Sequence, residues 1–172
     1  MDIILYGSLH GAAKRYAEHL AKVTGIKAFD YKDVKGLGQY DRVIYLGAIY
    51  AHGVTGLKKT VARMSPNQEL FLTTVGMVDP EDKAFFDAFK ESLKKQIPQQ
   101  LYDEKKIFHL RGAIDYSTMG LKHKLMMKFM HGKLARMPKE ELNAESKTIL
   151  ETYGKKVDYV DFDSLQPIVS IL

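Results

Sequence analysis

Residues 42–49 (RVIYLGAI) form a continuous apolar run with β-branched side chains. Such a run is typical of a strand buried on both faces, as in the parallel sheets of α/β proteins. Four further strand patterns lie elsewhere in the chain, at residues 2–6, 26–30, 69–75 and 106–114. Helical patterns separate them, at residues 12–24, 56–64 and 79–96. This alternation predicts an α/β fold: a doubly wound, five-stranded parallel sheet with helices on both faces.

Local signals predict where the helices begin and end. Gly25 stands where the first helix should stop, and Ser65-Pro66 should end the second. Asp79-Pro80 predicts an N-cap followed by proline at the first helical position. Towards the C-terminus we expect a helix at residues 120–137, a polar helix or mixed segment at 139–153 and a short closing helix at 163–172. No internal repeat or linker interrupts the pattern, so residues 1–172 are expected to form a single domain.

Composition excludes several classes of site. The chain of 172 residues has no cysteine, which rules out disulfides, thiolate metal sites and cysteine nucleophiles. Four of its six histidines, His19, His109, His123 and His131, show no ligand spacing, so no metal site is expected. The chain starts with no basic stretch followed by a long apolar run, and no apolar segment approaches the roughly 18 residues that span a bilayer. A cytoplasmic protein is therefore expected.

The net charge of +5 is concentrated in one segment. Residues 116–139 contain no acid and hold six cations, namely Lys122, Lys124, Lys128, Lys133, Arg136 and Lys139. On a helical projection two apolar sets fall on opposite faces: Met126, Met130, Leu134 and Met137 on one, Leu121, Leu125 and Phe129 on the other. If one face packs on the sheet, the other is exposed beside lysines and suits an anionic membrane, an acidic partner or a carboxylate ligand. The alternative is a core helix whose lysines reach to solvent.

The turn after the first strand has the features of a phosphate site. Gly7 and Gly11 permit a tight turn, Ser8 offers a hydroxyl, and a helix begins at Ala12 with unpaired N–H groups. The lysine-containing P-loop and the three-glycine dinucleotide fingerprint do not match this spacing. A mononucleotide held by hydroxyls and backbone N–H groups is the remaining option. Ligands of open α/β sheets bind beyond the carboxyl ends of the strands, so the segments after the first, third and fourth strands are the place to look.

The loop after the first strand, residues 47–53 (GAIYAHG) and the order of elements resemble the flavodoxin fold. More specifically, the chain is similar to the flavodoxin-domain family that includes the bacterial menaquinone-dependent protoporphyrinogen oxidase. The similarity covers most of the chain. Its most specific parts are residues 111–116 (RGAIDY) and the Met/Lys-rich residues 121–132 (LKHKLMMKFMHG).

The resemblance implies non-covalently bound FMN. The phosphate would be surrounded by Ser8, Leu9, His10, Gly11, Ala12 and Ala13. The isoalloxazine ring would be flanked by Ala48, Ile49, Tyr50, Ala51, His52 and Gly53 and by Thr74, Val75, Gly76 and Met77. The sequence departs from the family pattern at Ala13, where flavodoxin loops usually carry a hydroxyl.

The resemblance further implies an oxidoreductase that passes electrons from an organic substrate to a quinone or another acceptor. The basic segment would bind the substrate or a partner, with Asp115, Tyr116, Lys122, Lys124 and Lys128 as candidates. Peripheral contact with an anionic membrane is a further expectation, and no nucleic-acid partner is expected. Two alternatives stay open. One is a flavodoxin-type electron carrier, which the basic pI of 9.2 disfavours; the other is a flavin-free module that binds a partner, which Ala13 favours.

Overall fold

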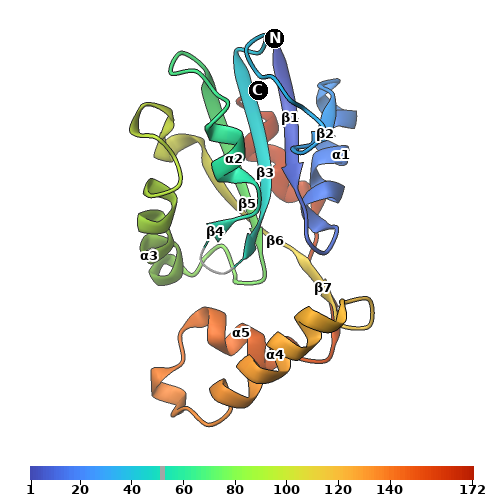
Figure 1. The fold of residues 1–172 in the computed structure, drawn as a ribbon, viewed down its shortest axis with the longest axis vertical. Coiled ribbons are helices and arrows are strands. Elements are labelled where there is room, and N and C mark those ends of the chain that lie inside the picture. Colours follow the sequence, from blue (N-terminus) through green and yellow to red (C-terminus); the bar gives the residue numbers. More distant parts are fainter. Residues whose placement is uncertain (51–52) are drawn as a thin grey trace.

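The computed structural model describes residues 1–50 and 53–172 and confirms the α/β fold (Figure 1). Within these residues five parallel strands lie side by side, in the order β2 (Ala28–Asp30), β1 (Asp2–Gly7), β3 (Arg42–Tyr50), β5 (Glu69–Gly76) and β6 (Ile107–Arg111). This is the order of flavodoxin-like doubly wound sheets, in which the chain reverses direction across the sheet between the first and third strands.

Successive side chains of the central strands point to opposite faces and fill two separate cores. Ile3 and Leu5 pack on the face covered by α2 (Leu57–Val61) and α3 (Lys83–Lys94). Ile4 packs on the other face, with α1 (Ala12–Thr24) and α6 (Gln166–Val169). Both faces are thus buried, which explains why the strands read as continuous apolar runs.

The predicted end of α1 is confirmed, but the predicted start of α3 is not. Gly25 ends α1 as predicted, with its N–H donating to the carbonyl of Ala21. The predicted start of α3 is wrong: Asp82, not Asp79, is the N-cap, and its carboxylate accepts a hydrogen bond from the N–H of Phe85. Asp79 instead accepts from the N–H of Glu81 in the turn before the helix. Both aspartates are residue types that cap helices well, and the helix begins after the second of them.

Three short strands depart from the predicted five-stranded parallel sheet. β4 (Gly53–Val54) turns back and pairs antiparallel with the end of β3. The single strand expected at residues 106–114 is divided at Gly112 into β6 and β7 (Ala113–Asp115). β7 leaves the main sheet and pairs antiparallel with β8 (Lys156–Asp158).

The β7–β8 ribbon carries a helical layer beyond the carboxyl ends of the main strands (Figure 1). This layer contains α4 (Leu121–Leu134) and α5 (Ala144–Thr152), and a small core of Ile114, Tyr116 and Met119 supports it. Met77, from the loop after β5, packs against the same core and links the layer to the sheet. Short 3-10 turns complete the chain at η1 (Gln99–Leu101), η2 (Glu104–Lys106), η3 (Lys139–Glu141) and η4 (Phe162–Leu165). Among the helices of residues 1–50 and 53–172, none has the length and apolarity that crossing a bilayer requires.

Tyr45 lies at the centre of the α2–α3 side of the sheet and is fully buried. Its hydroxyl donates to the carbonyl of Thr55, which fixes the turn that follows β4. A Cβ at Gly7 would lie 2.6 Å from this hydroxyl oxygen, and a Cβ at Gly56 would lie 2.4 Å from it. The ring therefore occupies space that side chains at both neighbouring positions would need.

An ion pair joins both ends of the described chain at the amino edge of the sheet. The Arg42 guanidinium donates through Nε to Oδ1 of Asp2 at 2.9 Å and through Nη2 to the carbonyl of Leu172 at 2.9 Å. The hydrogen bonds from Arg42 hold the pKa of the Asp2 carboxyl below its usual value, against the opposing effect of partial burial. Residues from β1, β3 and the C-terminal turn are thereby held together.

Candidate functional site

The loop between β1 and α1 forms the glycine-containing turn at which the sequence predicts a phosphate site. Gly11 is the N-cap of α1 at φ +87°, a left-handed conformation that only glycine adopts without strain. No side chain caps the helix there, and its first turn carries no acid. The first regular helical hydrogen bond runs from the N–H of Arg15 to the carbonyl of Gly11. The N–H groups of the first turn are therefore available to an anion.

Ser8 is positioned by the same turn. Its Oγ accepts a hydrogen bond from the N–H of Gly11 at 3.1 Å, which leaves the hydroxyl proton free to donate. Ala12 and Ala13 are buried against the sheet and offer no polar side chain. The phosphate donors in this turn are thus one hydroxyl and backbone N–H groups.

A cavity of about 80 Å³ opens beside this turn, at the carboxyl ends of β1, β3 and β5. Eleven of the predicted cofactor residues line it, namely Ser8, Leu9, His10, Ala12, Ala13, Ala48, Ile49, Tyr50, Val75, Gly76 and Met77. Three predicted residues lie elsewhere. Gly11 shapes the turn without lining the cavity, Gly53 lines a neighbouring cleft, and the Thr74 Oγ1 is buried 2.6 Å from Nδ1 of His109. Ala51 and His52 lie outside the described residues.

Sequence reasoning missed two residues of this cavity, Gly112 and Ala113. They lie where the chain leaves the main sheet, and the N–H of Gly112 donates to the carbonyl of Gly76 at 2.7 Å. Gly112 stands inside a run that reads as one strand, and that glycine was the one available sign of a break.

Tyr50 joins the cavity to the helical layer. Its side chain is 40% exposed at the end of β3. Its hydroxyl lies 3.5 Å from Sδ of Met126, and its ring meets the His123 ring edge-on with the centroids 6.0 Å apart. Tyr50 is therefore held between the sheet edge and α4, beside the cavity.

His10 lies between this cavity and a second one of about 230 Å³, which is lined by Leu9, His10, Thr118, Met119, Gly120 and His123. Desolvation, and to a lesser degree the nearby His123, lowers the pKa of His10. The imidazole is therefore neutral at pH 7 and brings no positive charge to the phosphate turn.

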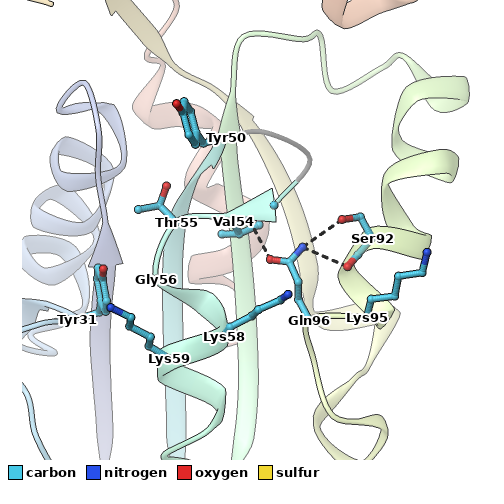
Figure 2. A pocket seen from close by; sticks show the side chains of 11 residues that line it. Tyr31, Tyr50, Val54, Thr55, Gly56, Lys58, Lys59, Ser92, Lys95 and Gln96 are labelled. Atoms are coloured by element: carbon cyan, nitrogen blue, oxygen red, sulfur yellow. Dashed lines mark hydrogen bonds between the residues drawn. The ribbon is translucent and has the colours of Figure 1, made fainter. Parts of the chain in front are cut away.

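A third and larger cleft of about 550 Å³ lies on the other side of Tyr50, between α2 and α3 (Figure 2). Its floor is held by Gln96, which accepts from the N–H of Val54 at 3.0 Å and donates to the carbonyl and hydroxyl oxygens of Ser92. Lys58, Lys59 and Lys95 stand around it. None of these lysines was predicted as a site residue.

The residues predicted for substrate or partner binding do not all lie together in the structure. Tyr116, Lys124 and Lys128 line an apolar groove of about 440 Å³ on the helical layer, together with Leu121, Leu125, Tyr153 and Gly154. Lys122 is exposed on α4 outside this groove. Asp115 lies apart from it: its carboxylate accepts from the N–H of Ser117 at 2.9 Å and pairs with Lys156 at 3.4 Å.

Metal-ligand groupings of three or more His, Asp or Glu side chains do not occur among residues 1–50 and 53–172.

Several solved structures resemble the chain, including the following three. Oxidised flavodoxin 1 from Bacillus cereus is 15% identical with a TM-score of 0.44, over 67% of this chain and 87% of that one. A putative flavoprotein from Bacteroides uniformis is 11% identical with a TM-score of 0.46, over 65% and 90%. The Flv1 flavodiiron core from Synechocystis sp. PCC6803 is 12% identical with a TM-score of 0.42, over 64% of this chain and 30% of that one.

No curated protein matches the chain significantly. The family model described as a flavodoxin domain matches residues 3–140, from β1 to the turn after α4. This match spans most of the chain, and the chain belongs to the flavodoxin domain family.

Proposed function

We propose that the protein is an FMN-dependent oxidoreductase that passes electrons from an organic substrate to a quinone or a protein acceptor. One observation carries the proposal: loops from three parallel strands meet at one cavity whose side wall is the uncapped N-terminus of α1. Membership of the flavodoxin domain family supports a flavin as the occupant.

The donors in the turn fit the phosphate of a mononucleotide. They comprise the Ser8 hydroxyl and the backbone N–H groups at the start of α1, in a turn that carries no carboxylate. An adenine dinucleotide would need further surface, and the cavity of about 80 Å³ is already below the range of roughly 300–1,000 Å³ typical of ligand sites. The neighbouring cavity of about 230 Å³, which His10 also lines, would supply room for a ring system.

A bound flavin supplies the exchange of electrons with substrate and acceptor, and the chain supplies its placement. Ser8 and the start of α1 would hold the phosphate, and Tyr50 would lie against the ring. Neutral His10 would add no charge beside the phosphate, so affinity would depend on hydrogen bonds and stacking. Met77, held to the helical layer, would close the side nearest α4.

The quinone-linked, protoporphyrinogen-oxidase-like type is our specific version of this proposal. The helical layer supports it, because α4 extends over the carboxyl edge and adds an exposed apolar face. Leu121, Leu125 and Phe129 are 86%, 70% and 75% exposed on that face, beside the lysines of the basic segment. We propose that this face rests on an anionic membrane on its cytoplasmic side, from which a lipid-soluble acceptor would reach the site.

Titration of the purified protein with FMN, and separately with FAD, tests the proposal. Quenching of flavin fluorescence that saturates at one FMN per chain, with weaker FAD binding, is the expected result. If the quenching does not saturate at high micromolar FMN, the proposal is contradicted and the alternative of a flavin-free module that binds a partner is favoured. Direct turnover with a soluble quinone analogue would then separate the enzyme from an electron carrier, which reduces a protein partner instead.

A further inference from the structure

We propose that the cleft between α2 and α3 binds an organic anion that carries two separated acidic groups, such as an aromatic dicarboxylate. The proposal concerns the cleft of about 550 Å³ lined by residues of β4, α2 and the end of α3. Its volume falls within the range of roughly 300–1,000 Å³ that organic ligands occupy.

The sign of the ligand's charge follows from the lining. Lys58, Lys59 and Lys95 contribute three positive charges, and no acidic side chain is among the described residues that line the cleft. Within residues 1–50 and 53–172, none of the three has a carboxylate oxygen within ion-pairing distance. Most other lysines of α3 are already paired, as Lys90 is with Asp87 and Glu104, and Lys94 with Glu91. Unpaired cations around a concave surface attract an anion.

The arrangement of the lysines favours two acidic groups over one. In Figure 2, Lys58 and Lys59 project from α2 and Lys95 projects from the end of α3. Their three ammonium groups lie apart from one another along the cleft. A single phosphate would need donors that converge on one point. Separated ammonium groups instead match carboxylates at the two ends of a longer molecule.

The space between the charges suits a ring. Tyr31 and Tyr50 bound the cleft on the side of the main sheet, and Val54 lies in its floor. The Gln96 amide is committed to Val54 and Ser92, so the floor is a fixed surface rather than a free donor set. The Thr55 hydroxyl lies on the rim and, among the described residues, makes no hydrogen bond. Aromatic walls with a hydroxyl and cations at the rim are suited to a flat, acidic molecule.

Tyr50 also lines the candidate flavin cavity, so the cleft and that cavity share a wall. On the proposed function, a molecule in the cleft is the organic substrate and lies next to the ring. The binding itself does not depend on that function, because every group named above belongs to the protein.

The test is a fluorescence titration of the purified protein with 2,6-naphthalenedicarboxylate, with its neutral dimethyl ester as a comparison. The variant K58Q/K59Q/K95Q removes the cleft charges, and K22Q/K27Q/K147Q removes three exposed charges outside every described cavity as a matched control. Thermal unfolding of both variants verifies that they are folded.

We expect saturable binding of the dicarboxylate, at least tenfold weaker binding of the ester, and at least a tenfold loss in K58Q/K59Q/K95Q only. Equal affinities in wild type and that variant, or equal losses in both variants, would overturn the proposal. If the protein binds the dicarboxylate but not FMN, the proposed function is refuted and the proposal for the cleft is supported. If the protein binds FMN but not the dicarboxylate, the proposal for the cleft is refuted and the FMN site is supported.

Discussion

The Tyr50 hydroxyl at the end of β3 lies 3.5 Å from the Met126 Sδ on α4, so a single side chain connects the sheet edge to the helical layer. The same ring lines both the candidate flavin cavity and the lysine cleft. Its removal should therefore affect cofactor binding and the position of α4 together.

Tyr50→Phe and Tyr50→Ala separate these two effects. The phenylalanine variant keeps the ring and loses only the contact with sulfur, so its FMN affinity should stay within about twofold of wild type. The alanine variant loses the ring, whose stacking and apolar burial are worth about 1.5 kcal/mol or more, and should bind FMN roughly tenfold more weakly. Fluorescence titration measures both. Equal affinities for FMN in all three proteins would show that Tyr50 is not beside the ring.

Ser8→Ala tests the phosphate turn. A hydrogen bond to a charged group contributes about 1.5–3 kcal/mol, so loss of the Ser8 hydroxyl should weaken FMN binding roughly 10- to 100-fold. Riboflavin, which has no phosphate, is the matched ligand control, because its affinity should not change. A similar loss for both ligands would indicate that the turn has been distorted rather than that a phosphate donor has been removed.

Membrane contact through α4 is tested by Leu125→Asp combined with Phe129→Asp. Two carboxylates on the exposed face remove apolar area and oppose anionic lipid, so sedimentation with phosphatidylglycerol vesicles should fall to background. Wild type should bind these vesicles and not phosphatidylcholine, with weaker binding as salt rises.

Val23→Asp combined with Ile171→Asp is the matched control for that experiment. These two side chains are 52% and 43% exposed and lie outside α4, so the same change of charge is made elsewhere. Retained vesicle binding in this control, with loss in the α4 variant, is expected. Equal losses would assign the effect to net charge alone.

Asp2→Asn should make stability depend less on pH. The folded-state pKa of Asp2 is lowered by Arg42, so its ionised form stabilises the fold above the ordinary pKa of 3.8. That contribution is lost as pH falls below 3.8 through the folded-state pKa. We expect the variant to lose about 1–3 kcal/mol of unfolding free energy at pH 7 and little at the lowest pH at which both proteins fold. Urea unfolding at several pH values measures this, and a loss that is constant with pH would contradict the assignment.

The centre of the main sheet could be predicted because β1, β3 and β5 are buried on both faces and therefore mostly apolar. Ile3, Ile4 and Leu5 are all buried, although they point to two different cores. The start of α3 could not be predicted in the same way, because Asp79 and Asp82 are both good caps and the local sequence does not distinguish between them.

The phosphate turn and most of the cavity lining were predicted because each loop directly follows a recognisable strand. Whether these residues bind FMN stays a prediction. The lysine cleft was not foreseen, because Lys58 on α2 and Lys95 at the end of α3 are far apart in the sequence. They line one cleft only because α2 and α3 cover the same face of the main sheet. The exposure of Leu121, Leu125 and Phe129 was one of two predicted outcomes, and the structure selects it over a core helix.

Tyr45 has a consequence for how this sequence can diverge. A Cβ at Gly7 would meet the backbone carbonyl oxygen of Thr55 at 2.2 Å as well as the Tyr45 hydroxyl, and a Cβ at Gly56 would also meet the Tyr31 ring at 2.6 Å. A smaller residue in place of Tyr45 therefore opens neither position by itself. Gly56 has the further restriction of φ +78°, so it should accept replacement last. In descendants of this chain Tyr45 should therefore change more readily than Gly7 or Gly56, because a side chain at Gly7 also requires the backbone at Thr55 to move.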